Sequence, residues 1–344
     1  MIPLHKEGLQ VLSEHIQKSD IVVVAPLNWG LGHATRCIPL IQYLVSHCEE
    51  VIIASDGLSL KLLTKEFPTL KTYVLPSYEV NYNYPSMILN MMLQGPSIFF
   101  TYQKELKIAK KIASETQATV IVSDNRFGFR AFGTKNFYIT HQVNILHPTR
   151  LITWISSSVH RYFIDKFDQC WIPDFAGERS LSGKLSESSA IKNVAYLGPL
   201  TRIKNKKSYI KWDICILLSG PEPQRTVLEN TLIDILPSWN TRKILMIRGT
   251  TNTNPKVKQI PDNCTIIDLA DSSEISDALH SSRLLIARSG YTTVMDIAHL
   301  DLKAIFIPTP GQTEQEYLAK ALTSNPKYSW VKQSDVSSIG KVLK

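Results

Sequence analysis

Short runs of aliphatic and β-branched residues recur along the whole chain, and amphipathic stretches separate them. The runs are almost continuously apolar, which is typical of strands covered on both faces of a parallel sheet. Alternation of such strands with helices predicts a doubly wound α/β structure. The predicted helices include Ala34–His47, Thr101–Thr116, Gln224–Leu236 and Thr292–Leu300. The predicted strands are Ile21–Ala25, Val51–Ala54, Thr72–Leu75, Thr119–Ser123, Phe137–Thr140, Ile214–Leu218, Ile244–Ile247, Thr265–Ile267, Leu284–Ala287 and Ala304–Ile307.

The series of strands and helices is interrupted once, in the middle of the chain. Gly198-Pro199-Leu200 is followed by the basic and polar stretch Thr201–Lys211, and a new apolar run begins at Ile214. The chain has 344 residues, whereas a typical domain has about 100–200. We therefore predict two Rossmann-like domains, residues 1–200 and 201–344.

Composition and charge narrow the class of protein. Hydrophobic residues make up 44% and charged residues 20%, as in globular proteins with substantial cores. No apolar run approaches the roughly 20 residues of a membrane-spanning helix. Five scattered cysteines without a CxxC pair favour reduced thiols and a cytoplasmic location. The net charge of +8 favours anionic partners such as nucleotides, phosphosugars or an acidic membrane face. Nucleic acid is the least favoured partner, because the basic residues form no stripe interleaved with aromatics.

One apolar concentration lies in the first half, over Met87–Phe100. It can be a patch that faces lipid, with nearby lysines contacting anionic headgroups. It can equally be ordinary core beneath a loop, which is the interpretation we favour from the sequence.

A glycine-rich loop follows the first predicted strand. Gly30 and Gly32 precede a helix, where the backbone can approach a ligand closely at the positive end of the helix dipole. A nicotinamide-dinucleotide fingerprint would need a third glycine where the chain has Thr35, so that motif is only partial. His33 lies where open α/β sheets bind ligands, and a neutral imidazole there can take a proton from a hydroxyl. The alternative is a histidine that caps the helix.

Two strand-to-helix junctions in the second half share a Ser-Gly step, at Ser219-Gly220 and at Ser289-Gly290. Together they can present backbone N–H groups to a diphosphate. The candidate donor-binding residues beyond these loops carry charge or amide groups. Arg225 and Arg288 can pair with phosphate, Asp296 with ribose hydroxyls, and Glu314 and Gln315 with sugar hydroxyls. The alternatives are a surface charge for Asp296 and helix-capping or surface roles for Glu314 and Gln315.

These motifs resemble a known family. GLGHATR, LSGP, ARSGYTTVMDIA and IPTPGQTEQEYLAKA look like a GT-B glycosyltransferase of the family 28 class, which includes the peptidoglycan lipid I N-acetylglucosaminyltransferase and the galactolipid synthases. The resemblance implies two domains facing across a cleft. The first would bind the acceptor, and the second a nucleotide-diphosphate sugar, usually a UDP-sugar. It also implies an acceptor that can be a lipid or glycan at the inner membrane face, and hence a protein peripheral to the membrane.

The resemblance assigns roles residue by residue. His33 matches the proposed general base, and the two Ser-Gly steps match the diphosphate loops. Asp296 stands where the family has a glutamate, and Glu314 replaces the first of two sugar-reading glutamines, so the identity of the sugar stays open. A group of proteins of similar size resembles this chain further, at the two strand ends that contain Asp124 and His141. Asp124 can orient His33 or the acceptor, and His141 is a second candidate base; a buried pair without chemistry is the alternative.

A mechanism follows from these assignments. The sequence has no DxD motif, so we expect no metal ion and no other cofactor, with helix N-termini and arginines neutralising the leaving diphosphate. We expect in-line displacement with inversion and His33 as the base. Two alternatives stay open: a UDP-sugar 2-epimerase-like enzyme, and a non-catalytic subunit that binds sugar nucleotides. The sequence leaves the sugar, the acceptor, the pathway and the oligomeric state undetermined.

Overall fold

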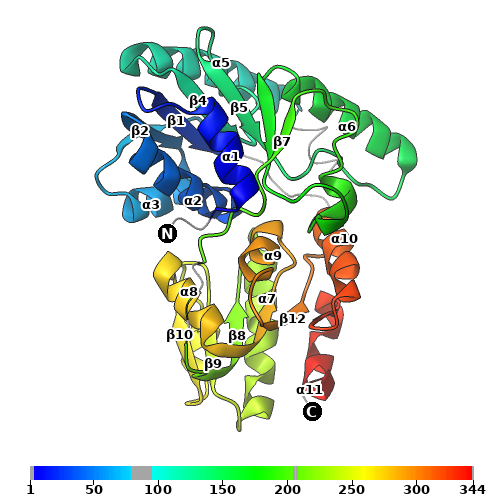
Figure 1. Cartoon of the computed structure of the whole chain (residues 1–344). Helices are drawn as coiled ribbons and strands as arrows, with labels where there is room; N and C mark the ends of the chain where they lie inside the picture. Colours follow the sequence, from blue (N-terminus) through cyan, green and yellow to red (C-terminus); the bar gives the residue numbers. More distant parts are fainter. Residues whose placement is uncertain (1–3, 79–94, 204–205, 207, 343–344) are drawn as a thin grey trace. The chain divides into compact units, whose positions relative to one another are not determined.

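The computed structural model describes residues 4–78, 95–203, 206 and 208–342. The chain forms two compact units, Met1–Arg202 and Ile203–Lys344, and each is built on its own parallel sheet (Figure 1). The prediction of a two-sheet α/β fold is therefore confirmed.

The first unit contains a seven-stranded sheet in the order β3-β2-β1-β4-β5-β6-β7, with every neighbouring pair parallel. Since β1 and β4 are neighbours at the centre, the order of the strands reverses there, and open α/β sheets bind ligands beside the carboxyl ends at such a point. The strands are β1 Ile21–Pro26, β2 Glu50–Ser55, β3 Lys71–Val74, β4 Val120–Asp124, β5 Lys135–Ile139, β6 Gln169–Ile172 and β7 Val194–Tyr196. The helices are α1 Lys6–His15, α2 Gly32–His47, α3 Gly57–Glu66, α5 Gly95–Thr116 and α6 Arg150–Ile164.

The second unit repeats this plan with six parallel strands in the order β10-β9-β8-β11-β12-β13. Its switch point lies between β8 and β11, which pair in parallel. The strands are β8 Trp212–Leu217, β9 Ile244–Ile247, β10 Cys264–Ile267, β11 Ser282–Ala287, β12 Lys303–Phe306 and β13 Tyr328–Trp330. The helices are α7 Gln224–Ile235, α8 Ser272–His280, α9 Tyr291–Ile297, α10 Thr313–Ala321 and α11 Ile339–Val342.

All ten runs predicted as strands are strands. The central ones are buried on both faces of their sheet, whereas the edge strands β3 and β10 are only partly buried. The predicted helices are present as well; the second begins at Gly95, earlier than expected. Strands β6, β7 and β13 are absent from the predicted runs, because each has only three or four residues and none carries a comparable apolar run.

The Met87–Phe100 concentration is described only in part, since residues 87–94 lie outside the described residues. Phe99 and Phe100, on the first turns of α5, are 57% and 66% exposed. The interpretation of this stretch as ordinary core is therefore wrong for these two residues. None of the helices in the described ranges is long and apolar enough to cross a membrane.

The N-terminal helix α1 is held close to the chain that leaves β7. A Cβ added to Gly8 would lie 2.4 Å from the backbone carbonyl oxygen of Leu197, so only glycine allows this approach. At Gly198, which has a φ of +67°, a Cβ would meet the ring of His5. The first and last parts of the first unit thus interlock through backbone contact.

We expect Gly8→Ala to lower the free energy of unfolding by about 1–3 kcal/mol, because a backbone carbonyl must move to admit the methyl group. Denaturant unfolding would measure the loss. Gly95→Ala is the matched control, since nothing lies within 4 Å of its added Cβ. Equal stability of the two variants would contradict the interpretation of Gly8.

Candidate active site

The switch point of the first sheet brings three predicted site residues together. Asp124 is the last residue of β4 and pairs in register with Pro26 at the end of β1. His33 lies on the first turn of α2, after the glycine loop, and its Nδ1 lies 2.7 Å from Asp124 Oδ1. His141 follows β5 and is joined to the same group through Arg36.

Asp124 is fully buried and surrounded by donors. Arg36 donates from Nε to Asp124 Oδ2 at 2.5 Å and from Nη2 to Oδ1, and the Cys37 thiol lies 3.4 Å from Oδ2. Burial alone would raise the pKa of Asp124, but the positive charge of Arg36 and the His33 ring outweigh burial and hold it well below its ordinary value. Asp124 is therefore a permanent anion and too weak a base to remove a proton from a hydroxyl.

His33 is the group of this cluster best suited to act as a base. Its side chain is 14% exposed, and burial lowers its pKa, with Asp124 opposing and Arg36 adding to that decrease. The imidazole is thus neutral near pH 7. Nδ1 lies 2.7 Å from Asp124 and 2.9 Å from Arg36 Nη2. Since Arg36 Nη2 also donates to the same carboxylate, we assign the Nδ1 proton to the shorter bond with Asp124, which leaves a lone pair on Nε2.

His141 has the opposite arrangement. Its Nδ1 lies 2.9 Å from Nη1 of Arg36, and a guanidinium can only donate. Neutral His141 must therefore carry its proton on Nε2, so it presents a donor where His33 presents an acceptor. Arg36 is not among the site residues predicted from the sequence, although its spacing of three residues from His33 on a helix places both side chains on one face.

A second buried ion group supports the loops beside this cluster. Arg126 is fully buried and forms ion pairs with Asp56 and with Glu105, the latter at 2.6 Å. It also donates from Nε to the carbonyl oxygen of Pro26 at 3.0 Å. Arg126 thus ties the ends of β1 and β2 to α5 and fixes the segment from which the glycine loop starts. In that loop, the indole N–H of Trp29 is buried without a hydrogen-bond partner among the described residues.

In the second unit, both Ser-Gly steps lie at the carboxyl ends of the adjacent strands β8 and β11, as the sequence analysis expected. Ser219 and Gly220 are exposed, Ser289 is fully buried, and Gly290 is the N-cap of α9. Gly220 has a φ of +106°, and a Cβ added to it would lie 3.9 Å from Oγ1 of Thr309. That hydroxyl, which the sequence analysis missed, is buried with no hydrogen-bond partner in the described part of the chain.

Arg288 lies in the corner formed by the loops that follow β8, β11 and β12, and its buried guanidinium group is only partly hydrogen-bonded to the described residues. It is 1% exposed and donates to the carbonyl oxygens of Ile307, Pro308 and Gln224 at 2.9–3.2 Å. Its Nε is buried and makes no hydrogen bond to any residue that the structure describes. Burial lowers the pKa of Arg288 to about 10, so it remains a cation at neutral pH.

Gln315 organises the same corner through bonds to its loops. Its side-chain oxygen accepts from the backbone N–H of Thr309 at 2.8 Å, and its amide nitrogen donates to Gln312 at 2.5 Å. Its backbone carbonyl accepts from the Ser289 hydroxyl at 2.7 Å. Gln315 therefore holds the loop after β12 against the loop after β11.

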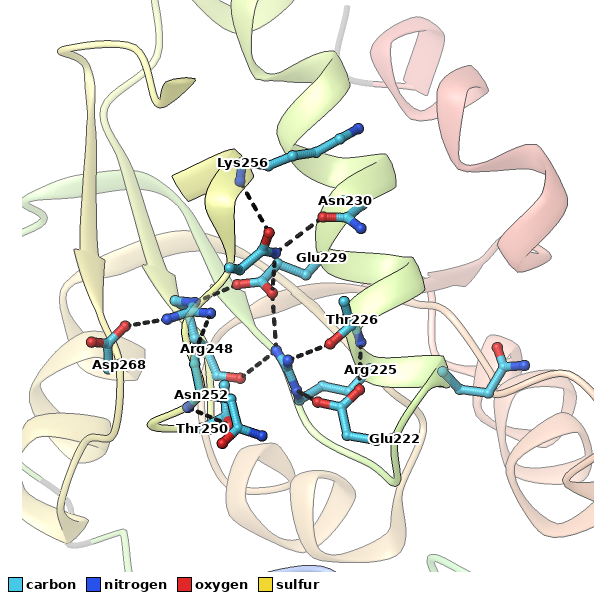
Figure 2. A network of polar contacts seen from close by, with 12 residues as sticks. Glu222, Arg225, Thr226, Glu229, Asn230, Arg248, Thr250, Asn252, Lys256 and Asp268 are labelled. Atoms are coloured by element: carbon cyan, nitrogen blue, oxygen red, sulfur yellow. Dashed lines mark hydrogen bonds and ion pairs between the residues drawn. The ribbon is translucent and has the colours of Figure 1, made fainter. Parts of the chain in front are cut away.

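Arg225 lies in a different environment, a network of ion pairs around the buried Glu229 (Figure 2). It contacts the carboxylates of Glu222 at 2.6 Å and Glu229 at 3.2 Å, and Glu229 also pairs with Arg248. Arg248 in turn pairs with Asp268 at 2.6 Å. The charge of Arg225 is thus balanced within the protein, in contrast to that of Arg288.

The two remaining predicted residues lie on α9 and α10. Asp296 is 3% exposed, so the alternative of a surface charge is wrong. Glu314 is half-buried on the first turn of α10. Within the described ranges, no group of three or more His, Cys, Asp or Glu side chains is placed to hold a metal ion.

Comparisons with known proteins agree with this geometry. The model of the glycosyltransferase family 28 C-terminal domain matches residues 223–344. An uncharacterized glycosyltransferase of Methanosarcina mazei is 24% identical over 319 residues, which are 83% of this chain and 79% of that protein. The UDP-N-acetylglucosamine–N-acetylmuramyl-(pentapeptide) pyrophosphoryl-undecaprenol N-acetylglucosamine transferase of Buchnera aphidicola is 29% identical over 55% of this chain and 52% of its own.

Solved structures show the same fold. The glycotransferase of kitacinnamycin superposes with a TM-score of 0.66 at 10% identity, over 95% of this chain and 91% of its own. Acinetobacter baumannii MurG gives a TM-score of 0.55 at 16% identity, over 94% and 88%. The chain is therefore a glycosyltransferase of the GT-B type that is similar to family 28, and its residues 223–344 correspond to the C-terminal domain of that family.

Proposed function

We propose that the protein transfers a sugar from a nucleotide-diphosphate donor, a UDP-sugar, to a hydroxyl group, with inversion and without a metal ion. The observation that carries the proposal is the His33–Asp124 pair, which lies at the switch point of the first sheet with the lone pair of His33 Nε2 available. In this proposal residues 1–200 bind the acceptor and residues 201–344 bind the donor.

The donor site that we propose is the corner formed by Gly220, Ser289, Gly290, Thr309 and Arg288. A diphosphate offers acceptor oxygens, and the corner offers an unpaired hydroxyl, a buried guanidinium with a free N–H, and a glycine that leaves room beside them. A buried donor without a partner is costly, so a ligand oxygen that accepts from it is stabilised there. Because Arg225 is balanced by two carboxylates, the proposal does not depend on it.

The proposed transfer requires that negative charge be stabilised on the leaving diphosphate and that a proton be removed from the acceptor hydroxyl. As the bond from the anomeric carbon to the diphosphate oxygen breaks, negative charge grows on the leaving group, and Arg288 stabilises it. The acceptor oxygen forms the new bond on the opposite face of the sugar and loses its proton to His33 Nε2. Asp124 stabilises the resulting imidazolium. The absence of a DxD motif supports neutralisation by the protein's own groups.

Related proteins support the nucleotide class. The spinosyn rhamnosyltransferase SpnG, solved with thymidine diphosphate, and the Phytolacca americana UGT2, solved with UDP-2fluoro-glucose, share the fold at 16% and 12% identity. The Buchnera relative is named for a pyrophosphoryl-undecaprenol acceptor. We therefore propose a UDP-sugar donor and a lipid or glycan hydroxyl as acceptor, with Asp296, Glu314 and Gln315 on the sugar-nucleotide side.

We expect UDP and UDP-sugars to raise the melting temperature of the protein, whereas NAD would leave it unchanged, since a ligand that binds only the folded state stabilises it.

Thr309→Val removes the side-chain hydroxyl and keeps the volume of the side chain. It should weaken UDP binding by about tenfold. Thr323→Val is the control, because the Thr323 hydroxyl donates to the carbonyl oxygen of Lys320 at the end of α10. No stabilisation by any nucleoside diphosphate would contradict the proposed function.

His33→Ala should reduce donor turnover by about 10²–10⁴-fold, because it removes the proton acceptor, while UDP affinity stays unchanged. Release of the nucleoside diphosphate from the UDP-sugar identified by thermal shift measures turnover. His47→Ala, at the exposed end of the same helix, is the control and should keep wild-type turnover. Wild-type turnover in the His33 variant would exclude this residue as the base.

Arg36→Gln should move the acidic limb of the pH–rate profile to higher pH. The positive charge of Arg36 helps to lower the pKa of His33, so its removal raises that pKa, and the imidazole is protonated at a higher pH. Turnover measured from pH 5 to 8 tests this, with melting curves to confirm folding. Arg36→Lys keeps the charge and should leave the limb near its wild-type position; a limb that shifts equally in both variants would contradict the electrostatic role.

A further inference from the structure

Asn125, the residue after Asp124, has an unusual backbone conformation. Its φ is +60°, in the left-handed region that few residues other than glycine adopt, although asparagine tolerates it better than most. Its backbone N–H still donates to the carbonyl oxygen of Ile139, the last residue of β5, at 3.2 Å. Residues held in this region cost free energy and are concentrated at functional sites. The side chain of Asn125 is therefore a candidate for a functional role.

Helix α6 contributes a buried histidine to the same region. Its apolar residues Leu151, Trp154 and Val159 are exposed, whereas Ser157 and His160 are buried. Burial lowers the pKa of His160 to about 4, so the ring is neutral at pH 7. Its Nδ1 has no hydrogen-bond partner in the described ranges, whereas a hydrogen bond to the backbone of Gln142 favours the protonated ring, as a carbonyl acceptor does. The single proton of the neutral ring therefore lies on Nε2.

The position of this proton fixes the direction of the next hydrogen bond. The hydroxyl of Tyr138 lies 3.4 Å from His160 Nε2 and 3.0 Å from Asn125 Oδ1. It cannot donate to a nitrogen that already carries a proton, so its own proton goes to Asn125. Tyr138 is fully buried, and burial raises the pKa of its hydroxyl far above the ordinary value, so that proton is permanent. The atom of Asn125 next to Tyr138 must then be the side-chain oxygen, because an amide nitrogen only donates.

The amide nitrogen of Asn125 is consequently left for a ligand. Nδ2 makes no hydrogen bond to any residue in the described part of the chain, and the side chain is half-buried. Asn125 directly follows Asp124, whose carboxylate bonds His33, at the strand end where the order of the first sheet reverses. This end of the sheet thus offers a proton acceptor, His33, together with an amide donor of fixed orientation.

We propose that Asn125 binds the acceptor substrate by donating to one of its oxygens, while a hydroxyl group of the same molecule reacts at His33. The acceptor then carries a second oxygen, as a glycan or polyol does and a simple alkyl alcohol does not. A hydrogen bond to this second oxygen orients the reacting hydroxyl toward its base. Tyr138 is a positioning residue that acts through Asn125. The inference rests on the proposed function and deepens it by naming the class of acceptor.

Asn125→Asp tests this inference, because it changes the amide donor into an acceptor and keeps the shape, the bond from Tyr138 and a residue that tolerates the left-handed region. The probes are octyl β-D-glucopyranoside, which offers several oxygens, and 1-octanol, which offers one. Each is added to the UDP-sugar identified by thermal shift, and release of UDP gives its kcat/KM. We expect the wild type to prefer octyl glucoside. The ratio of kcat/KM for octyl glucoside to that for 1-octanol should fall by at least about tenfold in the variant.

Asn193→Asp is the matched control. Asn193 is exposed and directly precedes β7, at the opposite end of the first sheet, so this variant should keep the wild-type ratio.

Tyr138→Phe tests the positioning role. It should lower the ratio by about threefold, because the amide of Asn125 is then free to rotate. In the Asn125→Asp background the same change should leave the ratio unaltered, since both oxygens of a carboxylate are acceptors and its orientation no longer matters. An equal loss in both backgrounds would contradict the positioning role.

Two results would overturn the inference: a wild type that octyl glucoside stimulates no more than 1-octanol does, or a wild-type ratio in the Asn125→Asp variant. Melting curves of the wild type with and without UDP separate these results from failure of the proposed function. A wild type that neither responds to UDP nor releases UDP from any UDP-sugar would refute the proposed function, and the inference with it. A wild type that does both but shows no preference for octyl glucoside would refute the inference alone.

Discussion

The arrangement of the first unit depends on one buried carboxylate. Asp124 has no access to water, so its charge must be balanced within the protein, and Arg36 balances it with two donors. The same guanidinium reaches both histidines, which makes the protonation of each ring a consequence of the ion pair. His33, bonded to the anion, keeps its outer nitrogen as an acceptor, whereas His141, bonded to the cation, keeps its outer nitrogen as a donor. One ion pair thus gives two similar side chains different chemical capacities.

Charge balance also distinguishes the arginines of the second unit. Arg225 and Arg248 share Glu229 with one another and reach Glu222 and Asp268, so that network is complete without a ligand (Figure 2). Arg288 donates to three backbone carbonyl oxygens, and its Nε has no hydrogen-bond partner in the described part of the chain. Both kinds of arginine are buried, but only the second kind has charge and a donor left for an anionic group.

Much of the fold could be predicted from the sequence, because strands buried on both faces need continuous apolar runs. The chemistry of His33 and of the two Ser-Gly steps could be located for the same reason, since each directly follows such a run. Thr309 could not be identified, because its significance lies in a missing partner and in its proximity to Gly220, which only coordinates give. The role of Arg36 required knowing that β4 lies beside β1. The outward orientation of the apolar face of α6 could not be predicted, because apolar residues at helical spacing normally face the core. Here the hydroxyls of Ser157 and Thr153 accept from the backbone N–H groups of Ile145 and His147.

The central claim is that Asp124 and Arg36 set the two imidazoles in opposite tautomers and thereby make His33 the base. Long-range ¹H–¹⁵N correlation spectra of ¹⁵N-histidine-labelled protein at pH 7.5 report the tautomer of each of the nine histidines, and His33→Gln and His141→Gln variants assign the two signals. The account predicts a proton on Nδ1 of His33 and on Nε2 of His141. A proton on Nε2 of His33, or a doubly protonated ring there, would contradict it.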